Sequence, residues 1–303
     1  MSQTMLQLVQ QTTAELNLAV PTYVAGNTSQ DVQQILALMN ASGYELLKEY
    51  DWQALQVQYR FYTQAISATA TTVNGSTTLT VDSGTDISAV DSQWQVTGYY
   101  VPQDTNVVTA DNTTKEIVLS QMCSGSGTGS YVLAQVAYDL PFDFETITNR
   151  TQWDKTKHWE MLGPEDAQQW QWLKSGYIST GPRIRWRILG EYFQTWPPMN
   201  TQEYLGFEYR SKGWVQAANG DTKNSFTADT DTCLFPDRIM VLACKLKFFQ
   251  IKNFDTTALQ QELERYLSVA KANDKGSAIL SFAPYPSKVL IGYANIPDTG
   301  YGS

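Results

Sequence analysis

The side chains that most often carry out chemistry are sparse and scattered along this sequence. It contains a single histidine, His158, between Lys157 and Trp159. A catalytic triad or a metal site needs nucleophiles or further ligands at a defined spacing, and no Gly-x-Ser-x-Gly or His-Glu-x-x-His arrangement is present. We therefore interpret His158 as a surface residue beside a strand, and we expect neither a metal nor a cofactor.

Two pairs of carboxylates come closest to an enzymatic pattern, because glycoside hydrolysis needs only two acidic side chains. Asp139 and Asp143 flank a Leu-Pro-Phe turn, where acids commonly accept hydrogen bonds from backbone N–H groups. Glu203 and Glu208 lie five positions apart in a predicted strand, so they point to opposite faces. Neither arrangement favours catalysis, and we expect the protein not to be an enzyme.

Three arginines, Arg183, Arg185 and Arg187, alternate with apolar residues. The period-2 geometry of a strand places the three guanidinium groups on one face. That face is either a contact stripe for an acidic partner or DNA, or a solvated face paired with nearby acids. The same region is rich in tryptophan, which indicates a β-core more readily than a sugar-binding platform. These tryptophans are Trp153, Trp159, Trp170, Trp172, Trp186 and Trp196.

The composition excludes several classes of protein. Only 17% of the 303 residues are charged, and a formal net charge of −9 disfavours generic binding to phosphate backbones. The cysteines, Cys123, Cys233 and Cys244, lack C-x-x-C spacing and are expected to be reduced and buried, as in a reducing cytoplasm. The first residues lack the pattern of a signal peptide, and no apolar window is long enough to cross a membrane.

The elements that must position these residues follow from the spacing of apolar side chains. Helical spacing over residues 2–17 and from Asn27 to Glu49 predicts a first pair of helices. The same spacing from Asp231 onward, and again from Thr257, predicts a second pair. Each pair has one apolar face and little else to cover it, so we expect the two pairs to pack on each other.

Between the helix pairs, alternating apolar residues predict β-structure. Residues 67–130 differ in composition from their surroundings, being dominated by Thr, Ser, Gly, Asp and Val. Asn74-Gly75 is a hairpin signal within this stretch, so it is predicted to be a small inserted β-domain and not a disordered linker. Residues 125–129, Gly-Ser-Gly-Thr-Gly, lack the lysine and the following helix of a phosphate-binding loop and are interpreted as a linker.

Together the patterns predict an α+β fold, with a helical-bundle core formed by the N- and C-terminal helix pairs, a β-rich middle and an inserted small β-domain. The C-terminal stretch has three prolines and cannot continue a helix, so it is expected to be an extended arm. The predicted segments are 1–66 (first part of the helical core and first strand), 67–130 (insert), 131–230 (β-rich middle with a short helix), 231–276 (second part of the helical core) and 277–303 (C-terminal arm).

Several short stretches, in a fixed order, cover the chain from end to end except for residues 67–130. They are Leu6–Val9, Ala14–Leu16, Gly43–Leu47, Tyr50–Leu55, Tyr138–Phe144, Gly163–Pro164, Gln169–Trp170, Phe207–Trp214 and Phe226–Thr232. In their order and spacing they resemble the head-to-tail adaptor proteins of short-tailed double-stranded-DNA phages, the family that includes tail tubular protein A.

The resemblance implies a structural virion protein of the neck and tail, made and assembled in the host cytoplasm. It implies a ring, twelve-fold in relatives, that joins the portal protein to the tail nozzle protein and lines the DNA exit channel. It also implies a mostly helical core with a β-part. Genomic DNA would then pass through the lumen without sequence-specific binding, since an acidic subunit repels phosphate. No membrane partner is implied.

The resemblance further implies that the C-terminal arm docks on the portal. Its apolar side chains suit the addition of a strand to a partner or the filling of a groove, although a last strand on the chain's own sheet is an alternative. Two other functions are left open, a glycan-hydrolysing and a glycan-binding tail component of the virion. The arm residues expected to make contact are Ile279, Leu280, Phe282, Tyr285, Val289, Leu290, Ile291 and Tyr293.

Overall fold

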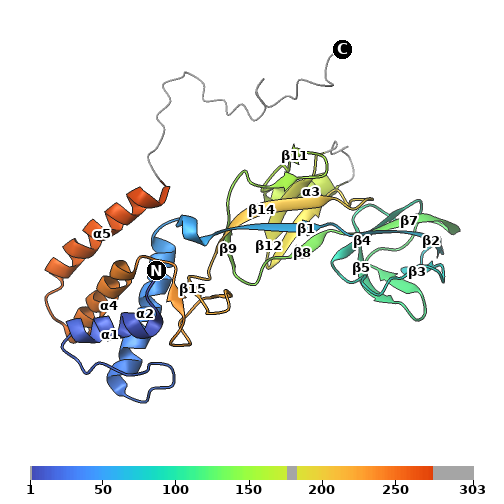
Figure 1. Ribbon diagram of the computed structural model, residues 1–303. Helices are drawn as coiled ribbons and strands as arrows, with labels where there is room; N and C mark the ends of the chain where they lie inside the picture. Colours follow the sequence, from blue (N-terminus) through green and yellow to red (C-terminus); the bar gives the residue numbers. More distant parts are fainter. Residues whose placement is uncertain (1, 176–182, 276–303) are drawn as a thin grey trace, which may run out of the picture.

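The computed structural model describes residues 2–175 and 183–275. They form an elongated molecule with three parts in a row: a helical end, a body of β-sheets in the middle and a closed β-barrel at the far end (Figure 1). The chain runs from the helices through the body into the barrel and then returns to the helices. No helix within the described residues is long and apolar enough to span a membrane.

The helical end is built around α4, which contacts the three other helices there. Its central residues are fully buried because α1, α2 and α5 cover it from different sides. The first helix begins with a capping box, in which the Thr4 hydroxyl accepts from the Gln7 N–H and the Gln7 amide oxygen accepts from the Thr4 N–H. The helices are α1 (Met5–Glu15), α2 (Gln30–Glu49), α4 (Asp237–Lys252) and α5 (Thr257–Lys275).

The body contains a five-stranded sheet and a three-stranded sheet that share an aromatic core. Phe193 stacks on Phe207 of the larger sheet at 5.0 Å and on Trp186 at 5.4 Å. The larger sheet comprises β1 (Gln56–Tyr62), β9 (Phe144–Ile147), β10 (Trp153–Asp154), β11 (Trp159–Glu160) and β14 (Tyr204–Ser211); the smaller comprises β8 (Ala137–Asp139), β12 (Arg185–Leu189) and β13 (Tyr192–Trp196).

Three smaller elements complete the body and its junction with the helices. A short helix, α3 (Ala167–Lys174), packs its Trp170 and Leu173 against Trp196. A 3-10 turn, η1 (Gln53–Leu55), connects α2 to β1. A small sheet next to the helices consists of β15 (Val215–Gln216), β16 (Thr222–Lys223) and β17 (Thr232–Cys233).

The barrel is a closed antiparallel ring of six strands, in the order β2-β3-β6-β5-β4-β7. It closes because β2 pairs along its whole length with β7, from Ala65 with Ala134 to Thr72 with Gly127. The predicted Asn74-Gly75 turn connects β2 to β3. The strands are β2 (Ala65–Thr72), β3 (Thr78–Val81), β4 (Trp94–Gly98), β5 (Thr105–Asp111), β6 (Glu116–Leu119) and β7 (Gly127–Gln135).

The glycine run at 125–129 is not a linker as predicted. From Gly127 onward it belongs to β7, and Gly125 lies so close to Tyr100 that an added Cβ would stand 2.3 Å from the ring. A residue without a Cβ is needed at Gly125 because the Tyr100 ring covers the backbone there.

The predicted fold class is wrong. The regular structure is mostly β-strand and includes the closed six-stranded barrel, while the five helices of the described residues are scattered along the chain. The helical-bundle core, and the mostly helical core that the resemblance implies, are corrected with it, because the buried apolar residues are divided among helical end, body and barrel. Helical periodicity gives a strong local signal, whereas short strands of Thr and Ser give a weak one. The five predicted segments stay predictions.

Candidate functional site

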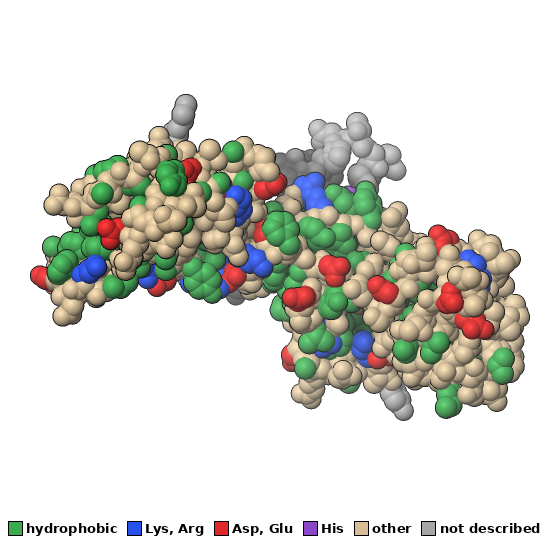
Figure 2. Space-filling model, turned by 90° about the horizontal axis from the view of Figure 1, so that it is seen from below, with side chains coloured by type: hydrophobic (Ala, Val, Ile, Leu, Met, Phe, Trp, Pro, Cys, Tyr) green, Lys and Arg blue, Asp and Glu red, His purple; other side chains and the backbone are tan. Residues whose placement is uncertain are grey.

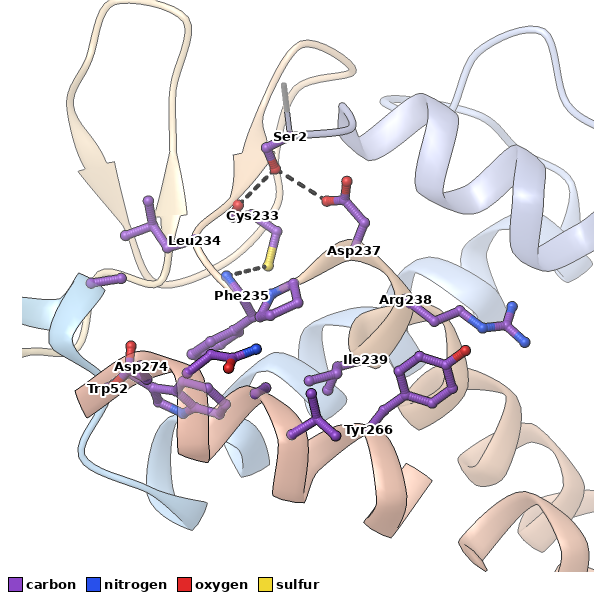
Figure 3. A pocket seen from close by; sticks show the side chains of 15 residues that line it. Ser2, Trp52, Cys233, Leu234, Phe235, Asp237, Arg238, Ile239, Tyr266 and Asp274 are labelled. Carbon is purple, nitrogen blue, oxygen red and sulfur yellow. Dashed lines mark hydrogen bonds between the residues drawn. The ribbon is translucent and has the colours of Figure 1, made fainter. Parts of the chain in front are cut away.

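A hollow of about 560 Å³ opens at the helical end, between the first turn of α4 and the last turns of α5 (Figure 3). We call it the helical groove. The side chains drawn in Figure 3 approach it from the N-terminal segment, from the start of η1, from the loop before α4, from α4 and from α5. Its apolar wall is formed by Trp52, Phe235, Ile239, Tyr266, Val269 and Ala270.

Trp52 forms a rigid part of this wall. Its indole N–H donates to the Leu46 carbonyl at 2.8 Å, and its ring packs edge-on to Tyr50 at 5.1 Å and tilted against Phe235 at 5.5 Å. A buried indole needs a hydrogen-bond partner, and the carbonyl at the end of α2 supplies it. The wall is therefore in place before any ligand binds.

The polar groups at the rim are already paired within the chain. The Asp237 carboxylate accepts from the Ser2 hydroxyl at 3.1 Å and from the Gln3 N–H at 3.0 Å. Arg238 forms ion pairs with Glu15 at 2.7 Å and with Glu262 at 3.0 Å. These contacts satisfy the charges without a ligand, so the groove suits an apolar occupant better than a charged small molecule.

Cys233 lines the groove but is not a reactive thiol. Burial raises its pKa to about 12, and its sulfur accepts from the Phe235 N–H at 3.3 Å. A thiol with so high a pKa carries almost no thiolate near neutral pH, which removes its nucleophilicity. The other two cysteines, Cys123 and Cys244, are also buried and unpaired.

The open side of the groove exposes large apolar side chains of α5. Tyr266 is 36% exposed and Val269 is 55% exposed, although Leu263 of the same helix is buried. Contiguous exposed apolar surface of this kind commonly marks an interaction site. Little in the sequence indicates this exposed surface. Tyr266 follows Leu263 at helical spacing, so nothing in the sequence separates the exposed side chain from the buried one.

The three alternating arginines, Arg183, Arg185 and Arg187, mostly contact other residues of the same chain. Arg185 forms an ion pair with Glu165 at 2.5 Å, and the Arg187 Nε donates to Gln194 at 2.8 Å. The Arg187 guanidinium also lies over the Trp170 ring, 4.5 Å from its centroid, and burial lowers its pKa. Arg183 is exposed just before β12. Two of the three arginines thus stabilise the body, and Arg183 is the one left most open to a partner.

The contacts of the carboxylate pair Asp139 and Asp143 are mainly structural. Asp143 is buried and accepts from the Tyr209 hydroxyl at 2.7 Å and the Ser211 hydroxyl at 2.6 Å. Burial and the adjacent Asp143 together raise the pKa of Tyr209. Asp139 stands exposed at the end of β8, with a contact of 3.4 Å to the Gln93 amide.

The two carboxylates of the other pair, Glu203 and Glu208, differ in burial and in partners. Glu203 is buried and forms an ion pair with Lys157 at 2.8 Å, while Thr201 donates to it at 2.9 Å. Glu208 lies half-buried within β14. Glu203 lies just before β14 and Glu208 lies within it, so the two carboxylates occupy different surroundings.

The other sequence candidates lie apart from the groove. His158 is exposed in the turn between β10 and β11, with a left-handed φ of 58°. Of the tryptophans, Trp170, Trp186 and Trp196 are buried in the body, whereas Trp159 and Trp172 are exposed. The residues of the C-terminal arm that were predicted to dock on the portal, Ile279 to Tyr293, lie outside the described residues.

One face of the molecule offers little for a polyanion. On the face drawn in Figure 2, basic and acidic side chains are mixed and spread singly, with no large patch of either sign. Within residues 2–175 and 183–275, no cluster of His, Cys, Asp or Glu could hold a metal ion. No protein-family model matches the chain, and no curated protein matches it either.

Proposed function

We propose that the chain is a structural adaptor of a short-tailed phage, which joins the portal protein to the tail nozzle protein as a ring around the DNA exit channel. The observation that carries the proposal is the helical groove, an apolar surface at one end of an elongated chain whose rim charges are already paired. Such a surface favours contact with protein.

The elongated arrangement supports the same proposal. A ring needs a heterologous interface, in which one face of each subunit meets a different face of the next. A chain with a helical end, a body and a barrel in a row offers separate surfaces to its neighbours, to the portal and to the nozzle (Figure 1). The net charge of −9 and the mixed surface charge are compatible with DNA sliding past without binding.

The C-terminal arm, residues 277–303, is proposed to dock on the portal, with Arg183 available for a further contact. Light scattering tests the proposal on the purified chain, alone and after mixing with the portal protein. We expect a discrete large complex that requires the portal and that is lost when residues 277–303 are deleted. As a matched control, Arg183→Ala should change the amount of complex far less than the deletion.

An indifferent response to the portal would contradict the adaptor proposal. The protein should then be tested for binding to and degradation of polysaccharide, the activities expected of a glycan-directed tail component. Trp159 and Trp172, the two exposed members of the tryptophan-rich region, are the side chains to substitute in that assay.

A further inference from the structure

The helical groove is an apolar surface that needs an occupant. Its open side exposes more than a third of Tyr266 and about half of Val269, which are 36% and 55% exposed. Exposed apolar side chains on a monomer attract any apolar segment that can reach them.

We propose that in the free subunit the helical groove is occupied by the chain's own residues 279–282, Ile-Leu-Ser-Phe. The last described turn of α5, with Asn273 and Asp274, lines the groove. The C-terminal segment that follows α5 therefore starts at the rim of the groove. Three residues, 276–278, separate the end of α5 from Ile279.

The dimensions of the two parts agree. The stretch of α5 from Tyr266 to Asn273 that lines the groove is roughly 10 Å long, at 1.5 Å per helical residue. An extended segment from Ile279 to Phe282 also covers roughly 10 Å, at 3.3 Å per residue. Gly276, the first residue after α5, is the type that most readily lets a chain turn back at the end of a helix.

The chemistry of the two parts also agrees. Residues 276–287 contain no charged side chain. The charged groups at the rim already have partners, since Arg238 pairs with Glu15 and Glu262, and Asp274 accepts from the Gln53 N–H at 2.9 Å. An uncharged segment can therefore cover the groove without leaving a buried charge unpaired.

The covalent connection favours the chain's own segment over that of a second copy. A short linker gives an effective concentration in the millimolar range, well above the concentration of free subunits in solution. The inference concerns the free subunit and does not depend on the adaptor function. If the adaptor function holds as well, portal binding must release this segment from the groove before the arm can dock.

Disulfide trapping in the full-length chain tests the inference. Val269→Cys combined with Leu280→Cys should form an intrachain disulfide under mild oxidation, identified by peptide mass spectrometry, at a yield independent of protein concentration. The control pairs Leu280→Cys with Leu189→Cys, whose native side chain is 52% exposed on the body. We expect the groove pair to crosslink more than about tenfold faster than the control, because residues 276–278 hold it close. Equal rates, or crosslinks only between chains, would overturn the inference.

Hydrogen exchange gives a readout that needs no new cysteine. Exchange of residues 279–282 in the full-length chain should be slowed, and Val269→Asp should restore fast exchange by placing a charge in the groove. Because Val269 is already 55% exposed, this change leaves the helical core intact. Fast exchange in the unsubstituted chain would overturn the inference, whereas portal binding, measured separately, decides the adaptor function.

Discussion

The barrel and the helical end bury similar kinds of apolar residues, but the barrel is closed on itself whereas the helical end has an open groove. In the barrel, pairing of β2 with β7 closes the ring, so no strand edge of that sheet is left open. At the helical end, α5 covers α4 on one side and leaves the helical groove beside it. In a closed sheet every strand pairs with two neighbours, so no backbone edge is left for a partner. Packed helices leave grooves between their axes, which makes the helical end the part suited to recognition.

The two ends also differ in electrostatics. At the helical end, ion pairs join residues far apart in the chain, as Glu15 of α1 pairs with Lys245 of α4 at 2.7 Å and Glu45 of α2 pairs with Lys247 at 2.5 Å. Within the described residues, the barrel's one ion pair, between Asp104 and Lys174 at 2.6 Å, leads out of the barrel to α3. Ion pairs between distant segments thus add to the apolar core of the helical end, whereas the barrel is joined mainly by strand pairing around its own apolar core.

The strongest test of this comparison is to remove the barrel. Residues 65–135 should be removable with a short linker from Gln64 to Val136, because the Gln135 N–H donates to the Gln64 carbonyl at 2.9 Å and the cut ends are adjacent. We expect the remaining chain to keep its helical circular-dichroism signal and a cooperative thermal transition. Aggregation or loss of the transition would mean that barrel and body form one cooperative unit.

Trp214→Ala should produce the next largest effect, at the helical end alone. Trp214 is fully buried and contacts Phe226 at 5.1 Å and Phe235 at 6.0 Å. Its truncation should lower the free energy of unfolding by about 3–5 kcal/mol, measured by denaturant titration. The exposed Trp172 provides the control, since Trp172→Ala should cost far less. If the barrel loses stability equally, the two ends are coupled.

Each end has a glycine beneath a buried aromatic ring, which allows a matched pair of substitutions. A Cβ on Gly43 of α2 would lie 2.3 Å from the Trp214 ring, and one on Gly98 of β4 would lie 2.0 Å from the Tyr131 ring. Gly43→Ala and Gly98→Ala should each lower stability by about 1–3 kcal/mol through overpacking. Gly129→Ala is the control, because its nearest contact is 3.9 Å away. A stabilised Gly43→Ala would show that helix propensity outweighs the clash.

Acidification should lower the stability of the fold by a smaller amount, and Glu15→Gln isolates the part that Glu15 contributes. Burial raises the pKa of Glu15, but hydrogen bonds from Lys245 and Gln11 and the charges of Lys245 and Arg238 outweigh it, so the net pKa is lowered. A lowered folded-state pKa stabilises the fold above the ordinary value of 4.5, and that contribution is lost as pH falls through the folded value.

Thermal unfolding across this pH range should therefore show a shallower loss of stability for Glu15→Gln than for the unsubstituted chain. Added salt should reduce the difference, because these partly exposed ion pairs are screened. Identical pH profiles for the two proteins would indicate that the Glu15 contacts contribute nothing to folding.

Local structure could be predicted from the sequence to a useful degree. The helix expected over residues 2–17 is α1, Met5–Glu15, and the one expected to end at Glu49 is α2. These predictions succeed because helical spacing reflects hydrogen bonds between residues four apart. The fold class was mispredicted, since the short strands of the body and barrel leave a weaker pattern than the helices.

The candidate site was beyond sequence reasoning for a different reason. The helical groove joins Trp52, Phe235 and Tyr266, which come from three distant parts of the chain. Alternation placed Arg185 and Arg187 on one face, but the partners that use them, Glu165 and Gln194, depend on how the body folds.

The sequence by itself determined the composition, the acidic charge and the local periods of helix and strand. The tertiary structure alone decided that Ala65 would pair with Ala134 and close a barrel, and that the elements within the described residues would leave Tyr266 and Val269 of α5 exposed. The physical reason is the range of the interactions. Periodicity records contacts between near neighbours, whereas closure and grooves depend on which distant surfaces meet and which find no partner.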